Sequence, residues 1–128
     1  MILFTSSNRK YMLAIDPIYT QSSRKIVIEA GANKLSFYGN EIYYLEAMQN
    51  YVQIHTQSGR HLVLMTLKRL MNLLPDTQFC QTHRSYVVNL NKVERFGGNH
   101  VKVNETLVPV SKRKRKDIMQ IIRNQKRS

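Results

Sequence analysis

Short runs of β-branched and aromatic residues make up the chain from Lys25 onward, and turn-forming residues separate them about every 8 to 12 positions. Such residues favour the pleated surface of a sheet, so this spacing is typical of an all-β domain. We therefore expect a mostly β fold. The runs lie at 26–28, 35–38, 42–47, 51–55, 60–65, 79–81, 86–89, 93–96, 100–103 and 107–110.

Turn residues between these runs predict which strands pair. Gln57-Ser58-Gly59 separates two runs that can form a hairpin. The pairs Gly97-Gly98 and Asn104-Glu105 separate the last three runs closely enough to predict an antiparallel meander.

One segment departs from the strand pattern. Thr66 is a good helix N-cap, and apolar residues at 67, 70, 71 and 74 repeat at three and four positions, as on the buried face of a helix. Pro75 cannot continue a helix and disfavours helical backbone at Leu74. We expect one short helix over residues 66–74. Isoleucines at 118, 121 and 122 have similar spacing, so the chain after Lys112 can also turn helical.

The charge of the chain is its most unusual property. It carries 20 Lys and Arg against 8 Asp and Glu, a formal net charge of +12. Such a positive field favours a polyanionic partner. Nucleic acid is the leading candidate, because each neutralised phosphate releases condensed counterions and so favours binding. Membrane surfaces and acidic proteins are weaker alternatives.

Candidate catalytic and metal-binding groups form no recognisable arrangement in the sequence. The carboxylates are scattered, and the four histidines lack a ligand spacing such as an i, i+4 pair. Gly97-Gly98 does not open a helix, as a phosphate-binding loop does. The neighbouring Cys80, His83 and Ser85 lie on a strand-like segment, where such residues are more often structural than catalytic. We expect no enzyme activity, no cofactor and no metal.

Cysteine usage and the apolar start of the chain bear on where the protein resides. Cys80 is the only cysteine, so no disulfide can form within the chain. The apolar residues 1–4 are too few for a signal peptide or a membrane span. We expect a cytoplasmic protein without membrane insertion.

Three polar clusters at the ends of the runs can contact nucleic acid. Amide and hydroxyl groups in the loop at 48–51 can reach base edges or phosphates, although an Asn there is usually a turn former. Arg84 can bind guanine O6 and N7, although it can also be an ordinary surface cation. The basic run at 112–116 can grip phosphates, although most such runs are only solvated. Each cluster alone is a weak indication.

Four sequence blocks bring these clusters together. They are Ile-Tyr-Tyr-Leu-Glu-Ala followed by Asn-Tyr-Val within 42–52, Leu-Lys-Arg-Leu through Leu-Pro at 67–75 with Phe79, His-Arg-Ser-Tyr-Val-Val-Asn-Leu at 83–90, and Val-Pro-Val-Ser-Lys-Arg at 108–113. In this order and approximate spacing they resemble the LytTR family of bacterial DNA-binding domains. The resemblance covers residues 26–116.

The resemblance implies about ten short strands in three small antiparallel sheets with one short helix. It also implies that loops, and not a recognition helix, enter successive major grooves, bend the duplex and read direct repeats in promoters. The base-reading positions carried over by motif are the loop of Asn50 and Tyr51, Arg84, and the first residues of the basic run. With His83 and the phosphate-holding lysines of that run, the expected DNA-binding residues are Asn50, Tyr51, His83, Arg84, Lys112, Arg113, Lys114 and Lys116.

We therefore expect a lead-in or linker at 1–25, a LytTR-type domain at 26–116 and a basic tail at 117–128. The expected function is sequence-specific binding of double-stranded DNA for transcription regulation. The resemblance to response-regulator output domains also admits a homodimer on DNA and an upstream receiver domain or sensor kinase. An RNA-binding module, or a protein-interaction domain coupled to a signalling partner, remains an alternative.

Overall fold

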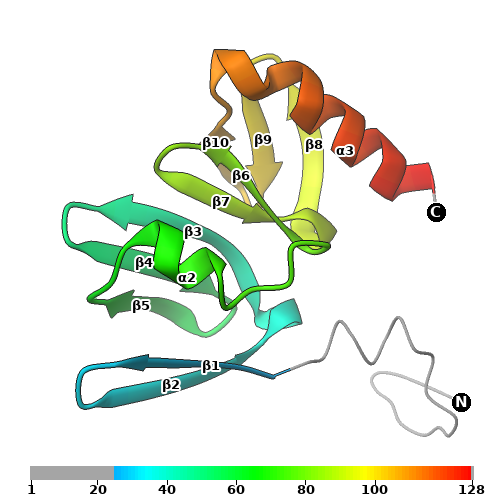
Figure 1. Ribbon diagram of the computed structural model, residues 1–128. Coiled ribbons are helices and arrows are strands. Elements are labelled where there is room, and N and C mark those ends of the chain that lie inside the picture. The colour runs from blue at the N-terminus through cyan, green and yellow to red at the C-terminus, as the bar shows by residue number, and fades with distance from the viewer. Residues whose placement is uncertain (1–24, 128) are drawn as a thin grey trace, which may run out of the picture.

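The computed structural model describes residues 25–127 (Figure 1). The expected lead-in at 1–25 therefore lies outside the described residues, apart from Lys25. The α-helices are α2 (Leu67–Met71) and α3 (Arg115–Arg127), and the 3-10 helices are η1 (Gly39–Glu41), η2 (Leu90–Lys92) and η3 (Lys112–Lys114). The strands are β1 (Lys25–Ala30), β2 (Asn33–Tyr38), β3 (Ile42–Met48), β4 (Tyr51–Thr56), β5 (Gly59–Val63), β6 (Phe79–His83), β7 (Tyr86–Asn89), β8 (Val93–Gly97), β9 (His100–Val103) and β10 (Thr106–Pro109).

The strands form three antiparallel sheets, which confirms the expected fold class. β1 and β2 make a hairpin, and the central sheet has five strands in the order β5-β4-β3-β7-β6. The last three strands form the expected meander, in the order β10-β9-β8. Asn104 and Glu105 both have positive φ (46° and 69°), as the two-residue turn of a twisted hairpin requires. The expected hairpin around Gln57–Gly59 is also present as β4 and β5.

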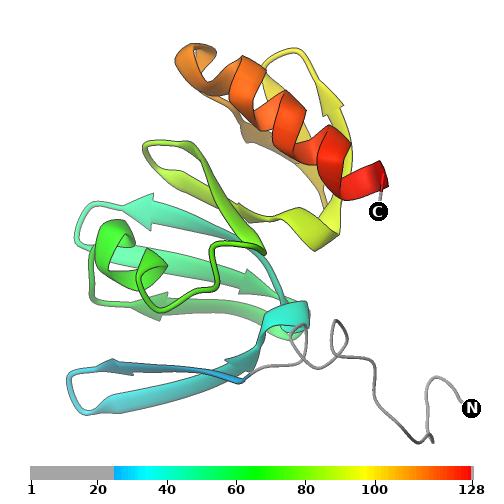
Figure 2. The same cartoon turned by 45° about the vertical axis from the view of Figure 1, so that its right-hand side comes forward.

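The two faces of the central sheet belong to two different hydrophobic clusters. Leu45 and Val87 point into a cluster built with the β1–β2 hairpin and α2. Their neighbours Tyr44 and Val88 point the other way, into a cluster with the three-stranded sheet and α3, because successive strand residues face opposite sides. Figure 2 shows α3 lying along the three-stranded sheet, on the far side of β6 and β7 from α2. The expected C-terminal helix is thus a packed element of this cluster, since α3 buries Ile118 and Ile122.

The helix after β5 is shorter than expected. Thr66 is its N-cap, as expected, because its Oγ1 accepts a hydrogen bond from the Arg69 N–H at 3.1 Å. The helix ends at Met71 and not at residue 74. Leu74 N–H donates to the Met71 carbonyl three residues back, a tighter turn that leads the chain to Pro75.

Candidate nucleic-acid interface

Backbone hydrogen bonds bring the three expected DNA-binding segments to one edge of the molecule. At the end of β3, the Ala47 N–H donates to the Ser85 carbonyl at 2.8 Å, which joins the β3–β4 tip to the β6–β7 turn. The Ser111 N–H donates to the Thr82 carbonyl at 2.8 Å, and Thr82 Oγ1 donates to the Pro109 carbonyl at 2.9 Å. The start of the basic run therefore lies beside β6, and the three segments form a continuous edge (Figure 1).

The β3–β4 tip carries the first segment into solvent. Met48 and Tyr51 face each other as the last register pair, and Gln49 with a φ of 55° and Asn50 make the turn between them. All four residues are exposed, with 44% of Met48 and 46% of Tyr51 accessible. Asn50 and Tyr51 can therefore reach a ligand without rearrangement of the sheet.

The β6–β7 turn presents Arg84, which is exposed. His83 braces this turn, because its Nδ1 accepts a hydrogen bond from the Ser85 N–H at 3.1 Å. A neutral imidazole that accepts at Nδ1 carries its proton on Nε2, which can then donate to a partner outside the turn. The Gln81 side-chain amide also donates to the Arg84 carbonyl at 3.5 Å. Arg84 thus projects from a turn that is held by hydrogen bonds with His83 and Gln81.

The basic run is helical, in line with the expectation that the chain after Lys112 can turn helical. Lys112 and Arg113 are exposed on η3, and Lys116 is exposed in the first turn of α3. Lys114 is half-buried, and its Nζ donates to the Gln81 carbonyl at 3.4 Å. Arg115 donates to the Asn99 side chain. The exposed cations of the run are therefore Lys112, Arg113 and Lys116, while Lys114 is partly engaged within the protein.

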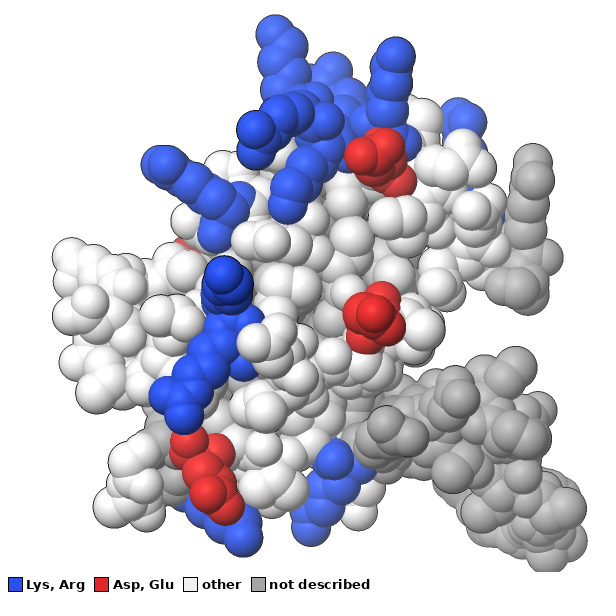
Figure 3. Space-filling view, viewed as in Figure 1, with Lys and Arg blue, Asp and Glu red and all other residues white. Residues whose placement is uncertain are grey.

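The positive charge extends beyond the three expected segments. In Figure 3, Lys and Arg side chains gather over η3 and the start of α3 and continue past the β6–β7 tip to α2. Lys68 and Arg69 of α2 are exposed. They were not among the expected DNA-binding residues, because the polar face of an amphipathic helix is usually only solvated. Their position directly after β5, next to β4 in the sheet, was the signal that could have placed them near the β3–β4 tip.

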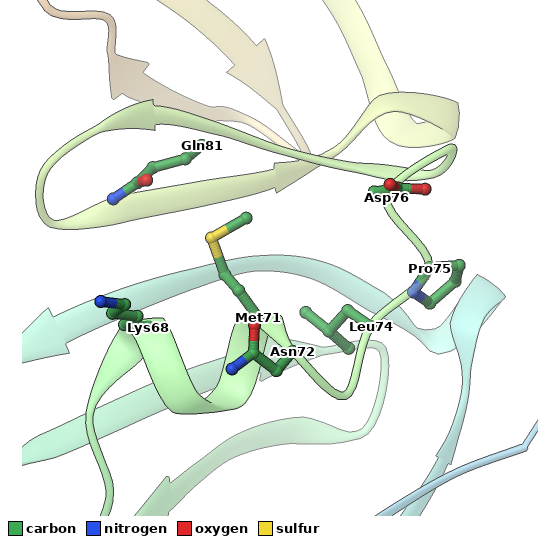
Figure 4. Close-up of a pocket in the computed structure, with 7 residues that line it drawn as sticks. All are labelled: Lys68, Met71, Asn72, Leu74, Pro75, Asp76 and Gln81. Atoms are coloured by element: carbon green, nitrogen blue, oxygen red, sulfur yellow. The ribbon is translucent and has the colours of Figure 1, made fainter.

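A groove lies between α2 with the segment that follows it and strand β6. Figure 4 shows Met71 pointing from α2 toward β6, with Gln81 across the groove from it. The volume of the groove is about 770 Å³. Its lining residues are Lys68, Met71, Asn72, Leu74, Pro75, Asp76 and Gln81.

Metal-ligating side chains and the single thiol were candidates for chemistry within the described residues. Among residues 25–127 no group of three or more His, Cys, Asp or Glu side chains is placed to hold a metal ion. Burial raises the pKa of the Cys80 thiol, and the nearby Lys114 only partly opposes this, so the thiol is a poor nucleophile. No helix in this part of the chain is long and apolar enough to cross a membrane.

Comparisons with known proteins identify the family to which the chain is similar. The family profile described as the LytTr DNA-binding domain matches residues 35–123. The transcriptional regulatory protein YpdB of Escherichia coli K12 is 31% identical over 90 residues, which are 65% of this chain and 37% of YpdB. The uncharacterized response regulatory protein VC_A0850 of Vibrio cholerae is 34% identical over 82 residues, which are 57% of this chain and 31% of that protein. The chain thus spans about a third of the length of these relatives.

The fold also has a counterpart among solved structures. A LytTr DNA-binding domain of a response regulator from Bacillus cereus superposes with a TM-score of 0.63 at 18% sequence identity. The match covers 77% of this chain and 95% of the Bacillus domain. At this identity the comparison shows a shared fold.

Proposed function

This chain belongs to the LytTR family of DNA-binding domains, and from that premise we propose that it regulates transcription by binding double-stranded DNA in a sequence-specific manner. The observation that carries the proposal is the single edge on which the β3–β4 tip, the β6–β7 turn and the basic run meet. The net charge of +12 supplies the attraction to phosphates. The loops of this edge are the parts that enter successive major grooves, and promoter sites with direct repeats are the proposed targets.

Base reading and phosphate binding fall to different residues. Arg84 has the guanidinium fork that can bind guanine O6 and N7 and projects from a braced turn. The exposed amide and hydroxyl of Asn50 and Tyr51 supply a second set of polar groups. Lys112 and Arg113 complete the proposed base-reading set.

The surrounding cations position the duplex. Lys116, the half-buried Lys114 and the exposed α2 side chains Lys68 and Arg69 are the proposed phosphate-binding groups. His83 supports the turn and offers its Nε2 proton as a further donor to DNA.

The longer relatives suggest how such a domain is controlled. The Vibrio relative is described as a response regulatory protein, and this chain matches less than half of it. We propose an upstream receiver domain or sensor kinase as the source of the signal, and two copies of the domain side by side on direct repeats.

The salt dependence of binding tests the proposal. We expect the affinity for a duplex selected from random sequence to fall with salt, with a slope of log K against log salt of about −4 to −5 if about five phosphates are neutralised. Single-stranded RNA of equal length should compete poorly. A flat salt response, or stronger binding to the RNA, would contradict duplex DNA recognition.

Single substitutions test whether base reading and phosphate binding are carried out by different residues. Arg84→Ala should lose roughly 1 to 3 kcal/mol on the selected duplex and relax one base position. Lys116→Ala should weaken selected and random duplexes about equally, because a phosphate contact carries no sequence information. Arg95→Ala is the charge-matched control, since Arg95 is exposed on β8, outside the three proposed DNA-binding segments. Equal losses on both duplexes for Arg84→Ala would refute its base-reading role.

A further inference from the structure

A carboxylate lies beneath the Arg84 turn, although the turn belongs to the basic edge. Glu46 on β3 is the register partner of Tyr86, the first residue of β7. The Tyr86 hydroxyl donates to Glu46 Oε2 at 3.0 Å, and His55 Nε2 lies 3.3 Å from Oε1. Only 28% of the Glu46 side chain is accessible, and each of its two oxygens has a partner within the protein.

Tyr86 also contacts the β6–β7 turn through His83. Its ring meets the His83 ring edge-on, with centroids 5.7 Å apart and an interplanar angle of 68°. His83 in turn accepts the Ser85 N–H, while the Ser85 carbonyl accepts the N–H of Ala47, the residue after Glu46. Ser85 follows Arg84 in the chain. Its N–H is therefore hydrogen-bonded to His83, and its carbonyl to the residue next to Glu46.

The other end of the network is packed against buried residues. The Tyr44 ring stacks on the His55 ring at 4.0 Å with an interplanar angle of 14°, and Tyr44 is buried. Burial raises the pKa of Tyr86, and the neighbouring Glu46 raises it further, so the hydroxyl stays protonated and continues to donate. Hydrogen bonds from fixed partners to a partly buried carboxylate are strong, because less water competes for it.

We propose that Glu46 is a positioning residue for DNA recognition: through Tyr86 and His83 it holds the Arg84 turn in the orientation that reads a base pair, without touching DNA. This inference rests on the proposed function. It assigns a positioning role to an acidic residue in a strongly basic domain, where a free carboxylate near phosphates would oppose binding.

A double-mutant cycle tests the proposal. Tyr86→Phe keeps the ring and removes only the hydroxyl that donates to Glu46. We expect it to lower the preference for a selected duplex over a random duplex about tenfold. In an Arg84→Ala background the same change should alter the preference by less than about twofold, because the turn then has no guanidinium to orient.

Variants of Glu46 separate the hydrogen bond from the charge. Glu46→Ala should reduce the preference as Tyr86→Phe does, whereas Glu46→Gln keeps an oxygen that can accept from Tyr86 and should retain most of it. Glu29→Ala is the charge-matched control, because Glu29 is 70% exposed on the β1–β2 hairpin with an ion pair to Lys34 at 4.0 Å. It should change binding to both duplexes equally.

The outcomes distinguish failure of the proposed function from failure of the positioning role of Glu46. If the unmodified protein does not discriminate the selected duplex, the proposed function itself fails. If it does discriminate, and Tyr86→Phe lowers thermal stability but leaves the preference unchanged, the role is only structural and the positioning proposal is overturned. Equal effects of Tyr86→Phe with and without Arg84 would overturn it as well.

Discussion

Replacing Asn89 by Ala should remove a large part of the stability of the domain. The Asn89 side chain is fully buried, and its Nδ2 donates to the carbonyls of Gly39 at 3.0 Å and Ile42 at 2.8 Å. Its Oδ1 accepts the Asn91 N–H at 2.9 Å. At about 1 kcal/mol for each hydrogen bond, the loss is about 3 kcal/mol, before the cost of leaving two carbonyls unsatisfied. For a domain of this size such a loss lowers Tm by on the order of 15 °C.

Urea unfolding followed by far-ultraviolet circular dichroism measures this loss. Asn91→Ala is the matched control, because Asn91 is exposed and contributes its backbone to the same group of hydrogen bonds. We expect Asn91→Ala to change the free energy of unfolding by no more than about 0.5 kcal/mol. A loss below about 1 kcal/mol for Asn89→Ala, or equal losses for the two variants, would refute the inference that Asn89 ties β7 to the β2–β3 connection.

Four further measurements test the packing and the ionisable groups. Leu70→Ala should cost about 2 to 5 kcal/mol in urea unfolding, and Leu73→Ala much less, because Leu70 is fully buried and Leu73 is 45% exposed. Thr66→Ala should cost about 1 kcal/mol in the same assay through the lost N-cap. Burial lowers the pKa of His55 below its usual 6.5, against the opposing effect of Glu46, so the unfolded chain binds the proton more readily and stability should fall as pH drops below about 6.5. Unfolding of a His55→Gln variant across this range should show a flatter pH dependence; an unchanged slope would contradict the assignment. Native Cys80 should react with a thiol reagent at pH 8 about tenfold more slowly than in the unfolded chain, because burial raises the pKa of its thiol.

Local patterns predicted the elements of the fold well, because strands and turns depend on neighbouring residues. The positive φ values at Asn104 and Glu105 match the residue types that mark the turn between β9 and β10. The helix was predicted too long because the apolar spacing continues to Leu74, although the last residues form a tighter turn before Pro75. Apolar spacing alone does not distinguish these two conformations.

Long-range pairing could not be predicted from residue patterns. Nothing beside Glu46 indicates that Tyr86, forty residues later, donates to it. Asn89 ends an apolar run, where a polar residue usually marks a turn, yet it is buried. The three-sheet arrangement was expected only from the resemblance to the LytTR family, which already contains this long-range information.

The segments of the site were predicted, and their relation in space was not. The sequence named the β3–β4 tip, the Arg84 turn and the basic run separately. Their adjacency depends on the contacts of Thr82 with Pro109 and Ser111, which no spacing encodes. Whether the named residues contact DNA stays a prediction for the binding experiments.

The pairing of β3 with β7 also sets the order in which the central sheet can form during synthesis. β4 can cover one edge of β3 as soon as Thr56 has been made, but the other edge stays open until Tyr86 to Asn89 emerge. Until then the nascent chain exposes the backbone of what will become its central strand, and open strand edges invite association with other chains. A product that stops before Tyr86 would keep this open edge, so chains released early are expected to aggregate, whereas the finished chain closes the edge within itself.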